Sequence, residues 1–72
     1  MNDKRERFKR VATRRTNAML KKLQVLGNCA NKSTYEYTEE EVNKIFAEIE
    51  RELKLTRMKF QFANNPPREF KL

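Results

Sequence analysis

The sequence contains no histidine and a single cysteine, Cys29. Zinc and other transition metals are held mainly by these two residue types, so no metal site is expected. Without histidine, a Ser-His-Asp or Cys-His arrangement cannot form within the chain. One cysteine excludes an internal disulfide and agrees with a reducing compartment. We expect Cys29 to be an ordinary small loop residue rather than a nucleophile, because no motif places a base beside it.

Glycine is equally scarce, and the single residue Gly27 cannot form a glycine-rich phosphate-binding loop. The carboxylates cluster where a helix is expected to begin, and capping explains them better than paired acid–base work does. No apolar run approaches the ~18 residues of a transmembrane helix, and the N-terminus lacks the apolar stretch of a signal peptide. These absences predict a cytoplasmic binding protein that is not an enzyme, needs no cofactor and has no membrane partner.

The composition is also poor in apolar residues. Hydrophobic and charged residues each make up 38% of the 72 residues, whereas typical values are about 45–50% and 25%. A lone chain of this size buries only about 60% of its unfolded surface, so the core is expected to be thin. Self-association is one way to cover apolar stripes that a small helical chain cannot bury alone, which makes a homodimer a candidate assembly.

Residues 3–26 are predicted to form the first helix. Apolar residues recur there with helical rather than alternating spacing, at Phe8, Ala12, Met19, Leu23 and Leu26, with Val11 and Leu20 widening the face. Gly27 follows the last of them, where a glycine can take the left-handed conformation that closes a helix. Residues 27–37 show no clear period and are rich in Asn, Ser and Thr, so they are expected to form an irregular loop.

The second helix is predicted over residues 38–60. Thr38 and Glu41 have the spacing of a capping box, and Tyr37 and Val42 have that of a hydrophobic staple. One face of this helix is apolar, with Val42, Ile45, Phe46, Ile49 and Leu53 continuing through Thr56 to Phe60. The run Asn64-Asn65-Pro66-Pro67 stops any helix.

These elements predict an all-α fold, a two-helix antiparallel hairpin with an irregular connecting loop that dimerisation could complete. Residues 1–63 would form a single domain and residues 64–72 a flexible tail. Near the end of the second helix, Leu55, Met58 and Phe62 fall on the side opposite the main apolar face at about 100° per residue. A second subunit, a partner protein, the tail through Phe70, or solvent could cover this second face.

Charge is strongly segregated along the chain. The first twenty-six residues hold nine Lys or Arg against two acids, a net charge of +7 that equals that of the whole chain. Residues 27–50 carry a net −4, and the remainder carries +4. Such segregation bears on partners and association rather than on the fold.

On the first helix, four basic residues are expected to form a ridge opposite the apolar face. They are Arg7, Arg10, Arg14 and Lys21, hereafter the basic ridge. Spacings of three, four and seven residues make it about 21 Å long. Lys4, Arg15 and Lys22 form a second row beside the apolar face. Arginine suits bidentate phosphate contact, so the nucleic-acid-binding candidates are Arg7, Arg10, Arg14, Arg15, Lys21 and Lys22. Thr13 and Asn17 lie near enough to add polar contacts.

Other interpretations of these residues remain open. A charge run on a small helix is usually a solvated face, and an acidic protein surface is an alternative partner. The acidic residues Glu36 and Glu39 to Glu41 could pair with part of the ridge. No spacing matches a defined DNA-reading motif. Tyr35 and Tyr37 could stack on bases, although a tyrosine beside a helix start more often packs to close a hairpin.

A longer pattern carries a resemblance. It consists of Arg15-Thr16-Asn17, Leu23, Leu26-Gly27-Asn28-Cys29, Asn31, Ser33, Tyr35-Glu36-Tyr37-Thr38-Glu39-Glu40-Glu41-Val42, Lys44-Ile45-Phe46, Ile49-Glu50 and Glu52-Leu53. It resembles short, largely uncharacterised helical proteins of Gram-positive phages and integrative mobile elements, over roughly residues 8–60. The resemblance implies a mobile-element context, in which small proteins commonly bind nucleic acid, repress genes or block host defences such as CRISPR nucleases.

The sequence therefore favours a small non-enzymatic binding protein of a mobile element. It would contact nucleic acid or a nucleoprotein through the basic face of its first helix. Two alternatives remain, a protein inhibitor of a host defence enzyme, similar in role to an anti-CRISPR protein, and a structural dimerisation module. The second apolar face of the second helix favours a protein partner.

Overall fold

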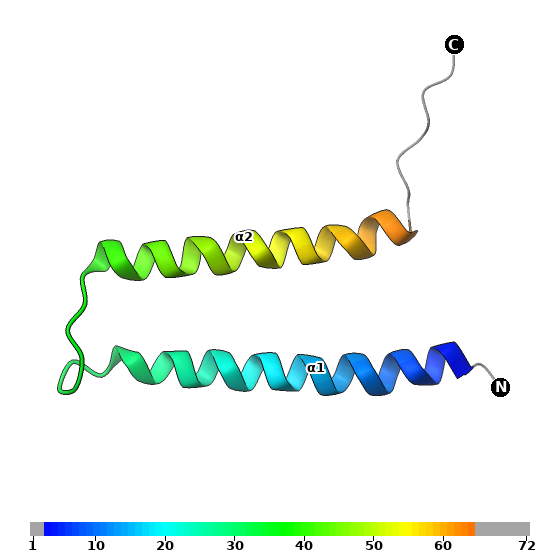
Figure 1. Cartoon of the computed structure of the whole chain (residues 1–72), viewed down its shortest axis with the longest axis horizontal. Coiled ribbons are helices and arrows are strands. Elements are labelled where there is room, and N and C mark those ends of the chain that lie inside the picture. Colours follow the sequence, from blue (N-terminus) through cyan, green and yellow to red (C-terminus); the bar gives the residue numbers. More distant parts are fainter. Residues whose placement is uncertain (1–2, 65–72) are drawn as a thin grey trace, which may run out of the picture. The chain divides into compact units, whose positions relative to one another are not determined.

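In a computed structural model that describes residues 3–64, the protein is all-α, as predicted. Two long helices, α1 (Asp3–Gly27) and α2 (Glu39–Asn64), are joined by a segment that includes a short 3-10 turn, η1 (Asn28–Ala30) (Figure 1). The chain divides between Glu36 and Tyr37 into two compact units, each built on one long helix. The antiparallel packing of the two helices and the single domain over residues 1–63 stay predictions.

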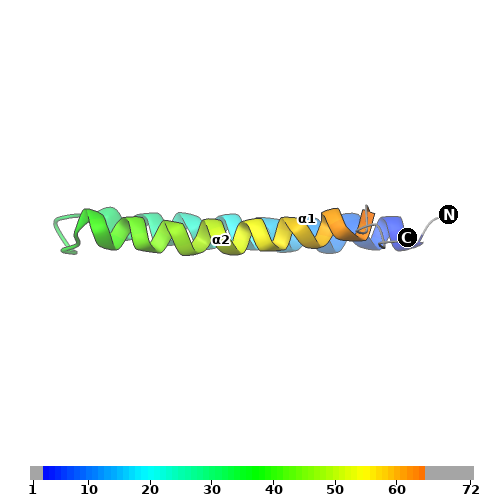
Figure 2. The same cartoon turned by 90° about the horizontal axis from the view of Figure 1, so that it is seen from above.

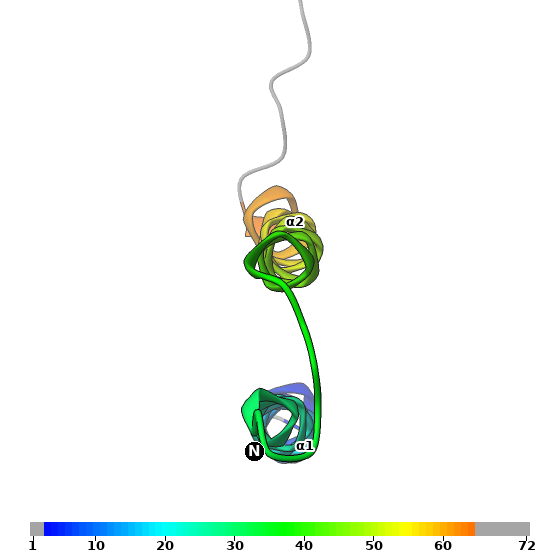
Figure 3. The ribbon, with the colours of Figure 1, turned by 90° about the vertical axis from the view of Figure 1, so that its left-hand side faces the viewer.

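Both helices run without interruption through their whole length (Figure 2). Seen almost end-on, the successive turns of α1 overlay one another (Figure 3). Neither helix contains a proline, the commonest cause of a sharp kink. The helical spacing read from the sequence therefore translates into continuous faces along each helix.

The end of α1 differs from the prediction. Gly27 is the last residue of α1 and has right-handed helical angles, with φ of −58° and ψ of −27°. The expected left-handed closure at Gly27 is therefore wrong, and no described residue has a positive φ. Instead the chain tightens into η1, and the Asn31 N–H donates to the Asn28 carbonyl at 3.4 Å. A 3-10 turn can satisfy the last carbonyls of a helix without a left-handed residue.

The connection after η1 is more ordered than an irregular loop. The Asn31 side-chain oxygen accepts a hydrogen bond from the Ser33 N–H at 3.0 Å. Its backbone carbonyl accepts from the N–H groups of Thr34 at 3.1 Å and Tyr35 at 2.9 Å. Asparagine is suited to this role because its side chain can bond to the backbone two residues ahead. Asn31 thus organises the turn that leads toward α2.

The predicted capping box is confirmed at the start of α2. The Glu41 N–H donates to the Thr38 hydroxyl oxygen at 3.1 Å, and the Thr38 N–H donates to a Glu41 carboxylate oxygen at 2.8 Å. The Val42 N–H bonds to the Thr38 carbonyl at 3.1 Å. Tyr37 and Val42 are both half-buried, but their contact in a hydrophobic staple stays a prediction.

The C-terminal end of α2 also differs from the prediction. The helix continues past Phe60 to Asn64, so the first residue of the predicted tail is helical. The helix can run this far because the nearest proline is Pro66, and a proline disfavours the helical conformation in the residue immediately before it. The predicted contact of the tail through Phe70 falls in residues 65–72, which lie outside the described residues.

No residue in the described range is buried. Seven side chains are half-buried, namely Val11, Ala12, Leu26, Tyr37, Val42, Ile49 and Met58. The other apolar residues of the two main faces are exposed. Over residues 3–64, no helix is long and apolar enough to cross a membrane.

Candidate nucleic-acid interface

The basic ridge lies entirely within α1. Because α1 is one continuous helix from Asp3 to Gly27, spacings of three, four and seven residues place the four side chains on one face, about 21 Å from end to end. All four are exposed. Within the described residues none of the four pairs with a carboxylate. The ridge is therefore a row of accessible positive charge.

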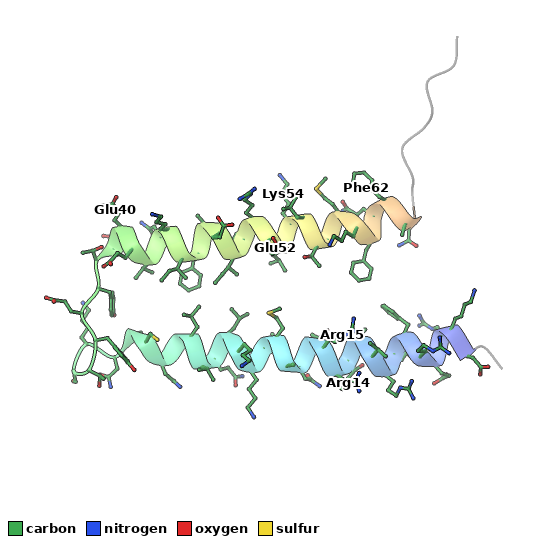
Figure 4. The ribbon with its side chains drawn as sticks, viewed as in Figure 1. Arg14, Arg15, Glu40, Glu52, Lys54 and Phe62 are labelled. Carbon is green, nitrogen blue, oxygen red and sulfur yellow. The ribbon has the colours of Figure 1, made fainter. Side chains whose placement is uncertain are left out.

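Arg15 and Lys22 are not part of this row. At about 100° per residue they lie roughly a quarter turn or more from the ridge, beside Phe8 and Leu26 of the apolar face. Figure 4 shows Arg14 and Arg15 leaving α1 in different directions. The six predicted binding residues therefore form two rows, both exposed. Long basic side chains beside an apolar face can lay their methylene stems along it.

Two acidic residues on the ridge were missed by the sequence reasoning. Asp3, Glu6, Arg7 and Arg10 line one shallow depression near the start of α1. The signal was present in the spacing, since Asp3 precedes Arg7 by four residues and Glu6 precedes Arg10 by four, which places each pair on the same helix surface. Carboxylates this close lie well within the ~8–10 Å screening length of physiological salt. The positive potential of the ridge is therefore expected to be strongest toward Arg14 and Lys21.

Thr13 and Asn17, the two polar residues expected near the ridge, are both exposed on α1. Their helix angles place Asn17 next to Arg10, and Thr13 between Asn17 and Leu20 at the edge of the apolar face. Hydroxyl and amide groups commonly contact phosphate and sugar oxygens, which fix the register of a protein on nucleic acid. The polar residues extend the candidate interface beyond the ridge itself.

The two tyrosines differ in their surroundings. Tyr35 ends the turn organised by Asn31, and 51% of its surface is exposed. Tyr37 is half-buried and immediately precedes the capping residue Thr38. Tyr35 thus keeps the open ring that base stacking requires, whereas Tyr37 has the position and burial of a packing residue.

Cys29 lies in η1, where it is exposed and free. Over the part of the chain that is described, no group of three or more His, Cys, Asp or Glu residues is placed to hold a metal ion.

Comparisons of the sequence with protein families, with curated proteins and with solved structures found no match.

Proposed function

We propose that the protein is a small non-enzymatic binding protein that contacts the phosphate backbone of a nucleic acid, free or within a nucleoprotein. The observation that supports this function is the basic ridge. Four exposed cations follow one face of α1 with no carboxylate partner in the described residues. Three of them are arginines, whose planar guanidinium groups can hold a phosphate with two hydrogen bonds.

The geometry suits a run of phosphates better than a single anion. A ridge about 21 Å long spans several phosphates of one strand, which are about 3.4 Å apart along the axis of duplex DNA. Contacts of this kind position a protein on the backbone and carry no direct sequence information. Binding is therefore expected to be largely independent of base sequence, and the proposed setting is the host cytoplasm during the life of a phage or integrative element.

The experiment is a binding panel with fluorescently labelled duplex DNA, single-stranded DNA and RNA at about 50 mM salt, where phosphate contacts are strong. An Arg10→Gln/Arg14→Gln variant removes two charges from the centre of the ridge. The matched control, Lys44→Gln/Lys54→Gln, removes two exposed charges from α2, away from its main apolar face. The proposal expects weaker binding by the ridge variant alone. Absence of binding to every nucleic acid in the panel would refute it.

A second candidate function, inhibition of a host enzyme by protein–protein contact, is favoured by the second apolar face of α2. Leu55 and Phe62 are 44% and 50% exposed, and Met58 is half-buried. Phe62 projects from the same side of α2 as Lys54 and Glu40 (Figure 4). Exposed aromatic and aliphatic side chains of this kind often anchor protein interfaces. A Phe62→Ala variant that keeps nucleic-acid binding but no longer captures a host enzyme would favour inhibition.

A further inference from the structure

The main apolar face of α2 has the spacing of a coiled coil. Six positions, hereafter the α2 stripe, are separated alternately by four and three residues, at Val42, Phe46, Ile49, Leu53, Thr56 and Phe60. This 3.5-residue repeat keeps the stripe facing a partner helix over about 27 Å. None of the six is buried, and Leu53 near the middle is 66% exposed.

We propose that the α2 stripe binds the α2 stripe of a second copy of this chain, with the two helices antiparallel and the two-fold axis near Arg51. The stripe is symmetric about that residue. Val42 and Phe60 are equally far from it, as are Phe46 and Thr56, and Ile49 and Leu53. Antiparallel pairing about this axis sets each position opposite its counterpart, which is the self-complementarity that a two-fold interface requires.

The charges of α2 are complementary in the same orientation. From Glu39 to Glu50 the helix carries five glutamates against Lys44, a net charge of −4. From Arg51 to Asn64 it carries four basic residues against Glu52, a net charge of +3. Antiparallel pairing brings the acidic half of one copy beside the basic half of the other, whereas parallel pairing sets −4 beside −4. Complementary charge of this kind fixes the orientation of partners.

Charged residues line both edges of the α2 stripe and would meet across the antiparallel interface. Glu50 and Arg57 lie on the same edge, so Glu50 of one copy approaches Arg57 of the other. Glu50 and Glu52 lie on opposite edges, each one residue from the axis, so each also approaches its own counterpart. The Glu50 pair is flanked by Arg57 of each copy. Arg51 faces away from the stripe, and its guanidinium contacts Glu48 at 3.4 Å on the exposed side.

The stripe is wide enough to serve in a bundle. From Ile45 to Phe46 the apolar face spans about 100° of the helix surface, wider than the seam of a two-stranded coiled coil. Pairing with a second copy therefore leaves part of the apolar face available to a further helix. An assembly of this kind buries apolar surface that residues 3–64 leave open in one chain.

The first test is the mass of the full chain by sedimentation equilibrium from about 1 to 100 μM, the range in which weak dimers dissociate. The proposal expects a mass of two chains. Leu53→Asp should return it to one chain, because it places a charge at the centre of the interface. Leu55→Asp makes the same change two residues away on the opposite face and should leave the dimer intact. A monomeric wild-type chain, or a dimer that survives Leu53→Asp, would overturn the proposal.

Disulfide trapping tests the orientation and does not depend on how Leu53→Asp folds. In a Cys29→Ser chain, a cysteine in place of Glu52 lies next to the axis and should link two copies on mild oxidation, since its counterpart is offset by only two residues, about 3 Å along the helices. A cysteine in place of Glu39 should not link two copies, because the two cysteines would each lie twelve residues from the axis, on opposite sides of it, and so about 36 Å apart.

Rapid linking at position 39 but not at 52 would indicate parallel pairing. No linking at either position, with a single-chain mass, would assign the stripe to another helix of the same chain. Either result contradicts the proposal.

Discussion

Thr38 and Glu41 exchange hydrogen bonds across the first turn of α2, with the Glu41 N–H donating to the Thr38 hydroxyl at 3.1 Å and the Thr38 N–H donating to the Glu41 carboxylate at 2.8 Å. The Thr38 hydroxyl also donates to the same carboxylate at 3.1 Å. These bonds satisfy backbone donors that the first turn of a helix leaves without partners. They define where α2 begins, and hence the register of every residue on its faces.

Thr38→Ala should lower the free energy of unfolding by about 1 kcal/mol, because the cap is lost and the Glu41 N–H must turn to water. Urea unfolding followed by circular dichroism measures the change. Thr34→Ala is a suitable control, since the backbone N–H of Thr34, and not its side chain, donates the hydrogen bond to Asn31 in the connecting turn. Equal stability of the Thr38 variant and the wild type would show that the box contributes nothing.

The capping box could be predicted because both partners lie within four residues, so the local sequence determines the contact. The same holds for the basic ridge, whose spacing needs only a continuous helix. Gly27 was predicted wrongly because a glycine permits a left-handed residue without requiring one, and the 3-10 turn at Asn28 offered another way to satisfy the carbonyls. The end of α2 was predicted four residues too early, because none of residues 61–64 is a proline or glycine that would end the helix before Asn64.

The acidic side of the ridge was missed for a different reason. Asp3 and Glu6 were counted in the net charge but not placed on the helix surface, although their distance from Arg7 and Arg10 was readable. The packing of α1 and α2 could not be derived in the same way. It depends on contacts between residues far apart in sequence. Because the chain has few apolar residues, several different packings could cover the apolar faces of α1 and α2.

Asp3→Asn/Glu6→Gln should tighten nucleic-acid binding, because it removes two negative charges from the depression that Arg7 and Arg10 also line. Each charge near a phosphate contact affects binding through the same electrostatic term that makes it salt-dependent. Titration of labelled duplex DNA measures the effect. Glu36→Gln/Glu40→Gln removes the same charge elsewhere and should change affinity less. An equal increase in DNA affinity in both variants would show that affinity responds to net charge alone. That result would contradict the basic ridge as the binding surface.

Tyr35→Ala should weaken binding to single-stranded DNA by a factor of about 5 to 150, the range that corresponds to the ~1–3 kcal/mol of one stacked base. The free energy of unfolding of the Tyr35→Ala variant should stay close to that of the wild type, because about half of the Tyr35 surface is already exposed. Tyr37→Ala should show the opposite pattern, a lower stability with affinity nearly unchanged. Filter binding and thermal unfolding of the two variants separate these roles. Loss of affinity in Tyr37→Ala alone would reverse the assignment.

Glu52→Gln should shift the monomer–dimer equilibrium toward the dimer, because it removes the repulsion between two copies of Glu52 beside the proposed axis. Sedimentation equilibrium at about 50 mM salt is suitable, since surface charges are screened less there than at physiological salt. Glu40→Gln serves as the control, because Glu40 projects from the opposite side of α2, with Lys54 and Phe62 (Figure 4). A weaker dimer in the Glu52 variant would contradict the antiparallel arrangement.

The most direct measurement of the central claim is the salt dependence of binding to duplex DNA, for the wild type and for Arg10→Gln/Arg14→Gln. Four phosphate contacts predict a slope of log K against log[salt] near about −3.6, and removing two of them should reduce its magnitude by about 2. The Lys44→Gln/Lys54→Gln control should keep the wild-type slope. A wild-type slope near zero, or equal slopes in the wild type and the ridge variant, would show that the basic ridge does not hold the phosphate backbone.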